Sequence, residues 1–153
     1  MSTAQSQARL ASALWEAERH RATLAEALAE GSGLREPNMQ ALEADPALRR
    51  LSDQILYRFM KLQDALGERL VPATLARLLE PYEAWSMRDR LDRLEKLAFL
   101  DVDPWLEWRD VRNRQAHEYP DAPALRHAAA LAAIHAAAAL IAAYDHWKAR
   151  LPA

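Results

Sequence analysis

Apolar residues recur along much of this chain at spacings of three and four, which is the period of an amphipathic α-helix. The first such stretch predicts a helix over residues 3–30, and Gly31-Ser32-Gly33 ends it in the manner of a glycine C-cap. The expected inward stripe of this helix consists of Leu10, Leu14, Ala17, Leu24 and Leu28.

A second helix is predicted after residues 34–44, which carry no clear period and indicate a loop or a single turn. Asp45-Pro46 is typical of an N-cap followed by a proline in the first helical turn. This helix is expected to stop near Gly67 or to run on to Leu70. Its apolar positions are Leu48, Leu51, Ile55, Phe59, Leu62 and Leu66.

Prolines and capping residues divide the middle of the chain. Pro72 and Pro81 are expected to bracket a short helix over residues 73–80, and Ser86 is expected to cap the helix after it. The apolar positions that this capped helix should turn inward are Met87, Leu91, Leu94 and Leu97.

The last third of the chain predicts two more helices. Asp103-Pro104 repeats the signature of an N-cap and a first-turn proline. Pro120 should end that helix, because the residue before a proline is driven out of the α region. Residues 121–123 then begin a final long helix that runs to about Arg150. The penultimate helix is expected to bury Trp105, Trp108 and Val111.

Composition agrees with an all-α fold. Ala and Leu dominate the apolar residues and favour helix, Val and Ile are scarce, and three glycines offer little material for hairpins. The length suits one domain, and no fixed-period repeat points to a solenoid. We therefore expect a single domain over residues 1–153, built as an antiparallel bundle of four to five main helices.

Several classes of protein are disfavoured. The absence of cysteine excludes disulfides and thiolate metal sites. Residues 1–7 lack the basic and apolar regions of a secretory leader, and the alanine-rich stretch 128–143 is expected to be too short and too weakly apolar for a bilayer of ~20 residues. We therefore expect a cytoplasmic protein without a membrane partner. A net charge of −2 argues against coating nucleic acid, although a local basic patch stays possible.

One segment carries most of the candidate chemistry. Four residues separate Arg112 from His117, and Tyr119 follows two positions later. This spacing resembles the Arg-x4-His-x-Tyr signature of HepT, a ribonuclease toxin of the HEPN family that is paired with a minimal nucleotidyltransferase antitoxin. The resemblance also includes Asn113, Ala116 and Pro120, and it extends weakly over the whole chain as the order of helices.

The resemblance implies a HEPN-like homodimer in which both motifs face one cleft, and metal-independent cleavage of RNA without a cofactor. Arg112, His117 and Asn113 would be the catalytic residues. The partner nucleotidyltransferase would silence the toxin by attaching AMP to Tyr119. Added phosphates next to Arg112 would occupy the anion site and repel RNA.

The chemistry of these residue types agrees with such a role. Metal-independent RNA cleavage uses the 2′-hydroxyl as nucleophile, so it needs proton transfer and a cation for the phosphate. His117 can move protons near neutral pH, Arg112 suits phosphate oxygens, and Asn113 can orient a polar group. Arg109 and Arg114, on the same helix, are candidates for further RNA contacts.

Helix geometry restricts how the motif can work. On one straight helix His117 lies roughly 140° around from Arg112, so the two side chains would not meet. Tyr119 would lie close to the face of Arg112, and Asn113 would share a face with His117. Either the helix unwinds before Pro120, or the site is shared between two subunits.

Plainer interpretations exist for each residue. His117 could be a histidine favoured by a helix C-terminus, Arg112 could pair with Asp110, Glu107 or another carboxylate, and Tyr119 could cover the core. Trp105 and Trp108 could stack on bases, but their spacing favours the core. Three histidines of the last helix lack the spacing of a metal-ligand pair and are interpreted as surface or core-edge residues: His127, His135 and His146.

Three functions therefore stand side by side. The first is a ribonuclease toxin that a nucleotidyltransferase silences. The second is a non-catalytic partner subunit of a nucleotidyltransferase, in which Arg112, His117 and Tyr119 would bind the partner or its nucleotide. The third is a helical dimerisation module that carries the motif by chance.

Overall fold

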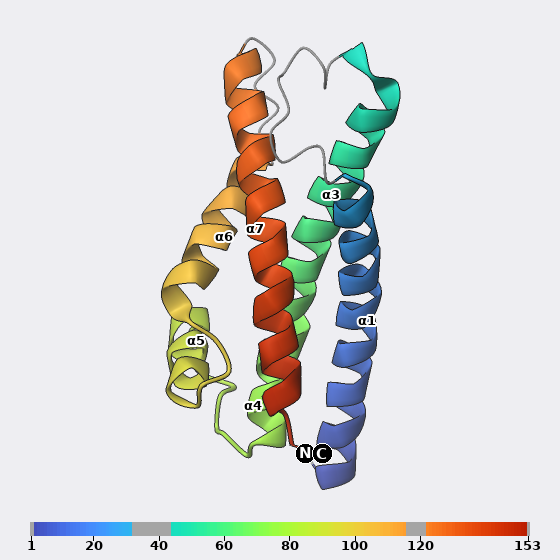
Figure 1. Cartoon of the computed structure of the whole chain (residues 1–153). Helices are drawn as coiled ribbons and strands as arrows, with labels where there is room; N and C mark the ends of the chain where they lie inside the picture. Colours follow the sequence, from blue (N-terminus) through green and yellow to red (C-terminus); the bar gives the residue numbers. More distant parts are fainter. Residues whose placement is uncertain (1, 32–43, 116–121, 153) are drawn as a thin grey trace.

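The computed structural model describes residues 2–31, 44–115 and 122–152, and every regular element in these ranges is a helix (Figure 1). The predicted all-α class is confirmed. The predicted loop or turn at residues 34–44 lies almost wholly outside the described residues. The elements are α1 (Thr3–Glu30), α3 (Pro46–Ala65), the π-helical turn η2 (Leu66–Leu70), α4 (Val71–Arg77), α5 (Met87–Lys96), α6 (Val102–Gln115) and α7 (Pro123–Arg150).

Helix α1 has the bounds that its sequence predicts. The Ser2 side chain accepts from the backbone N–H of Gln5, and the Gln5 side chain accepts from the Ser2 N–H, which forms a capping box. At the other end the Gly31 N–H donates to the Ala27 carbonyl. Leu10, Leu14, Ala17, Leu24 and Leu28 all lie in or against the core.

The helical path that begins with α3 extends further than the sequence suggests. The Asp45 carboxylate caps α3 by accepting from the N–H groups of Ala47 and Leu48, as predicted. The expected stop between Gly67 and Leu70 is wrong, because the chain continues through η2 into α4.

Pro72 does not begin a separate helix. The Val71 N–H donates to the carbonyl of Leu66, five residues earlier, so the helix is widened immediately before the proline. A π-turn of this kind adds a residue to the helix and relieves the clash that a proline ring makes with the preceding turn. The proline therefore lies inside a continuous helical path.

Helix ends elsewhere follow local backbone geometry. Helix α4 ends at Arg77 rather than at the predicted Glu80, and Leu79 has a left-handed φ of 61°. Ser86 caps α5 as predicted, by accepting from the Asp89 N–H. Helix α6 begins at Val102, before the predicted cap Asp103, and the Val102 N–H donates to the Glu95 carboxylate at 2.7 Å.

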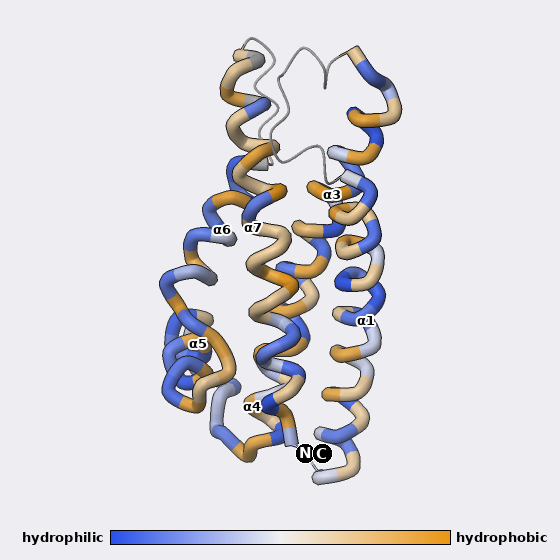
Figure 2. Tube along the Cα trace, in the orientation of Figure 1, coloured by the Kyte–Doolittle hydropathy of each residue, from blue (hydrophilic) through white to orange (hydrophobic). Residues whose placement is uncertain are grey.

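The long helices α1, α3 and α7 lie side by side, and α6 lies against α7 and α3 (Figure 1). The colours of Figure 1 show that α1 and α3 run in opposite directions along this group. Hydrophobic and hydrophilic segments alternate along α1 and α3, whereas α7 is largely hydrophobic (Figure 2). The core between them includes Phe59, Leu62, Tyr144 and Trp147, all fully buried.

Residues His127–Arg150 of α7 are long and apolar enough to cross a membrane, judged by length and composition alone. The expectation that residues 128–143 are too short and too weakly apolar for a bilayer considered only part of this longer segment. Core helices pass the same test. Here Tyr144 and Trp147 are buried against the other helices, and the Trp147 indole N–H donates to the Thr74 hydroxyl at 3.1 Å.

Candidate functional site

One face of α6 carries four of the residues that surround a half-open pocket. Trp105, Arg109, Arg112 and Asn113 recur at helical spacing and therefore share a face of α6. Residues of α3 and η2, together with Met87 of α5, complete the lining. The pocket has a volume of about 300 Å³, and its lining from α3 and η2 is Gln63, Asp64, Gly67 and Glu68.

The Arg112 guanidinium is held at the wall of this pocket by a bidentate ion pair with Asp64. Its Nε donates to Oδ1 at 2.8 Å and its Nη2 donates to Oδ2 at 3.0 Å. Both side chains are about one third exposed, so water and solutes still reach the pair. The hydrogen bond to Asp64 raises the pKa of Arg112, which keeps the guanidinium charged. The alternative of a carboxylate partner for Arg112 is therefore realised, with Asp64 rather than Asp110 or Glu107.

Gln63 lines the same pocket and carries a buried, unsatisfied amide. The residue is 4 % exposed, and neither its Oε1 nor its Nε2 has a hydrogen-bond partner among the described residues. A buried amide without partners costs about 1–3 kcal/mol. Sequence reasoning missed this residue, although a signal exists: Gln63 is a polar residue four positions after Phe59 and three before Leu66, within the apolar stripe of its helix.

The π-turn η2 shapes the floor of the pocket. A side-chain carbon placed on Gly67 would lie 3.4 Å from Cζ2 of Trp105, in ordinary van der Waals contact with the indole. Trp105 is 4 % exposed and also packs against Trp147, with ring centroids 6.5 Å apart. π-Turns inside α-helices are frequent at functional sites.

The structure brings together three of the predicted site residues: Arg109, Arg112 and Asn113 all line the pocket. Arg109 is exposed and makes no ion pair within the described part of the chain. Arg114 is also exposed but does not line this pocket. His117 and Tyr119 lie outside the described residues, as do Ala116 and Pro120.

The two tryptophans of α6 were expected in the core, and three histidines of α7 at the surface or at the edge of the core. Trp105 belongs to the core, and Trp108 packs against it while staying half-buried. His135 and His146 are exposed and His127 is half-buried. Across residues 2–31, 44–115 and 122–152, no group of three or more His, Asp or Glu side chains could hold a metal ion.

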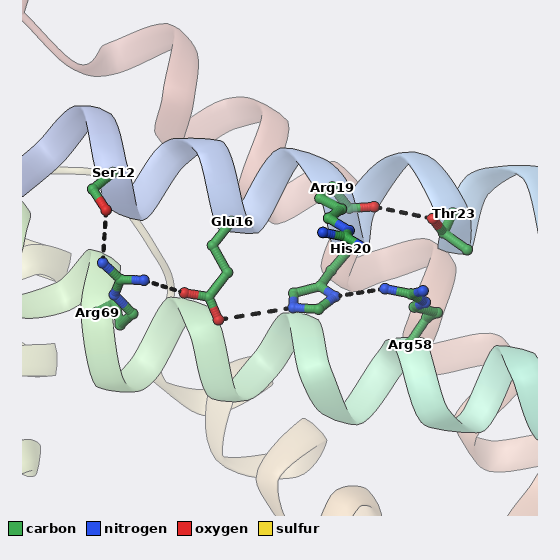
Figure 3. A network of polar contacts seen from close by, with 7 residues as sticks. All are labelled: Ser12, Glu16, Arg19, His20, Thr23, Arg58 and Arg69. Atoms are coloured by element: carbon green, nitrogen blue, oxygen red, sulfur yellow. Dashed lines mark hydrogen bonds and ion pairs between the residues drawn. The ribbon is translucent and has the colours of Figure 1, made fainter.

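A second polar cluster joins α1 to α3 and η2 on another part of the molecule (Figure 3). Glu16 accepts from Arg69 at 2.5 Å and lies 3.8 Å from Nε2 of His20, while Nδ1 of His20 lies 3.0 Å from Arg58. Burial and the positive charge of Arg58 lower the pKa of His20, so its ring is neutral at neutral pH. The members of this cluster bind one another, and none of them lines the pocket described above.

Comparison of the chain with protein-family models, with curated proteins and with solved structures found no match.

Proposed function

We propose that this chain is a metal-independent endoribonuclease toxin of the HEPN type, with its active site at the C-terminal end of α6. The observation that carries the proposal is the convergence of Arg109, Arg112 and Asn113 on one accessible pocket, immediately before the His117 segment. The motif begins in α6, the penultimate described helix, and the HepT resemblance implies a motif at the end of the penultimate long helix.

The proposed reaction needs little beyond proton transfer and charge. The RNA 2′-hydroxyl attacks the adjacent phosphorus and loses its proton, the bond to the 5′-oxygen breaks, and that oxygen takes up a proton. His117 carries out the proton transfer, and Arg112 stabilises the charge on the phosphate oxygens. Asn113 orients the substrate by hydrogen bonding, and Arg109 and Arg114 bind flanking phosphates.

The proposal includes a HEPN-like antiparallel bundle that forms a homodimer. Arg112 already uses its side of α6 to reach Asp64 on α3. A straight continuation of α6 would point His117 roughly 140° away from it. A cleft shared by two subunits brings the Arg112 of one subunit to the His117 of the other.

The proposed regulator is a minimal nucleotidyltransferase that attaches AMP to Tyr119. The phosphates so added would lie near Arg112 and compete with RNA for it. The proposed location is cytoplasmic.

The ion pair itself favours a second candidate, the non-catalytic partner subunit of a nucleotidyltransferase. Asp64 already neutralises Arg112 in the free chain. In this ion pair Arg112 joins α6 to α3, which is a structural role that requires no substrate. In this alternative the pocket binds the partner or its nucleotide, and RNA is not cut.

The two candidates are separated by expressing the wild type and His117→Ala under tight control and incubating each purified protein with RNA in EDTA. Cleavage and growth arrest by the wild type alone support the ribonuclease. Intact RNA with both proteins, together with a stable complex with a nucleotidyltransferase, supports the partner subunit. A mass measurement on Tyr119 confirms that the protein tested is unmodified.

A further inference from the structure

The pocket between α6 and η2 differs in character from a phosphate site. Its two most buried lining residues are Gln63 and Trp105, each 4 % exposed. The charged groups Arg109 and Glu68 are exposed. Arg112 and Asp64 are paired with each other and partly exposed, so the most buried part of the lining is uncharged.

The unpartnered amide of Gln63 is the unusual feature of this interior. Burying an amide without a hydrogen bond is unfavourable, so a turn of this side chain toward a ligand that offers both a donor and an acceptor would recover that cost. Gln63 lines the same pocket as Asp64, the residue that holds Arg112. A ligand that reaches the amide therefore lies beside the proposed phosphate clamp.

We propose that this pocket binds the base of a nucleotide next to the scissile phosphate and prefers adenine. This inference rests on the proposed function and specifies its substrate. The amide oxygen of Gln63 accepts from the exocyclic amino group of adenine, and the amide nitrogen donates to the neighbouring ring nitrogen, which is the pairing typical of glutamine with adenine. Trp105 and Met87 contact the base, and Arg109 binds the backbone at the rim.

The size and shape of the pocket agree with one base. A volume of about 300 Å³ lies at the lower end of the range of ~300–1,000 Å³ for small-molecule sites. Gly67 lines the pocket beside Trp105 and adds no side chain to it.

The test is a binding measurement that does not depend on cleavage. Fluorescein-labelled 2′-O-methyl hexanucleotides lack the free 2′-hydroxyl nucleophile, so they stay intact. Five positions hold uridine and one central position holds adenine, guanine, cytosine or uracil. Fluorescence anisotropy with the dimeric full-length protein gives the affinity for each.

We expect the adenine oligonucleotide to bind about tenfold more tightly than the uracil one, the discrimination typical of one bidentate amide–base pair. Gln63→Leu should reduce this preference to less than about twofold, by weakening the binding of the adenine oligonucleotide. Gln54→Leu, on the same helix but outside the pocket, should keep the full preference. Gln63→Asn retains a buried amide on a shorter side chain, so it should fold like the wild type and also lose the preference.

Equal binding of all four oligonucleotides, no binding of any of them, or an unchanged preference in Gln63→Leu and Gln63→Asn would overturn the pocket assignment. These outcomes differ from a failure of the proposed function, which is an absence of cleavage of unmodified RNA. Thermal unfolding of Gln63→Leu supplies an independent check. Removing an unsatisfied buried amide should leave the midpoint equal to or above that of the wild type.

Discussion

The Arg112 guanidinium stands between two partners, Asp64 in the free protein and an RNA phosphate in the proposed complex. The observed pair is bidentate and about one third exposed, so a phosphate can replace the carboxylate without desolvating a buried charge. Asp64 thus keeps Arg112 extended into the pocket wall and also competes with the substrate.

The Asp64→Asn substitution separates these two effects. Without the carboxylate charge, Arg112 is free to bind phosphate, so affinity for single-stranded RNA should rise. The slope of log K against log salt should steepen by about 0.7, the value for one further phosphate contact on a single strand. Asp92→Asn, which breaks the exposed pair with Arg88, should leave the slope unchanged. Weaker binding in Asp64→Asn at every salt concentration would contradict competition by the carboxylate.

At the residue scale, the sequence singled out three residues of α6 that line the pocket, but none of the lining residues on α3 and η2. Arg109, Arg112 and Asn113 were found because they lie in or beside a contiguous motif. Asp64 lies 48 positions away from Arg112, and only the packing of α3 against α6 brings them together. Spacing along one helix carries no information about that distance.

At the scale of elements, the path from α3 through η2 to α4 forms the floor of the pocket. Sequence reasoning treated Gly67 and Pro72 as breaks, because both residues usually end helices. The π-turn accommodates both, since the chain widens just before the proline. Local propensity predicted the helix starts at Asp45 and Ser86 well, because capping is a local hydrogen bond.

The Gly67→Ala substitution tests whether the backbone of the π-turn requires glycine at this position. Its φ is not in the left-handed region, and the added methyl would lie 3.4 Å from Trp105, an ordinary contact. We expect the free energy of unfolding in urea to rise by about 0.5–1 kcal/mol, because alanine loses less entropy in a helix. A fall of similar size would show that the π-turn itself needs glycine.

On the scale of the whole molecule, hydrogen bonds and ion pairs join α1 to α7. Arg21 donates to Asp145 at 2.9 and 2.7 Å, and Glu18 accepts from Tyr144 and Lys148 on α7. These contacts lower the pKa of Glu18 and of Asp145. Their contribution to stability is therefore complete above the ordinary carboxylate range near pH 4 and is lost as the pH falls through the lowered values.

His20 adds a pH dependence in a different range. Burial and Arg58 lower its pKa, with Lys61 and Arg19 acting in the same direction and Glu16 against them. The unfolded chain takes up a proton near pH 6.5 while folded His20 stays neutral, so stability should decline as the pH falls below about 6.5. Between pH 7.5 and 5.5 His20→Gln should lose less free energy of unfolding than the wild type. The exposed His135→Gln should behave as the wild type, and equal losses in all three proteins would contradict the assignment.

The shared cleft of the proposed homodimer makes a quantitative prediction. If each site takes Arg112 from one subunit and His117 from the other, mixing inactive Arg112→Ala and His117→Ala subunits restores one site in each mixed dimer. Random exchange then gives about a quarter of wild-type activity, because half of the dimers are mixed and each has one of two sites intact. No recovery after verified subunit exchange would place both residues in one subunit.

The most direct test of the central claim is the chemistry of the RNA ends. Attack by the 2′-hydroxyl leaves a 2′,3′-cyclic phosphate on one fragment and a 5′-hydroxyl on the other. Mass spectrometry of a defined oligoribonucleotide treated with unmodified wild-type protein in EDTA should find these ends, and His117→Ala should produce neither. Products with a 5′-phosphate, or intact RNA with both proteins, would contradict the proposed ribonuclease.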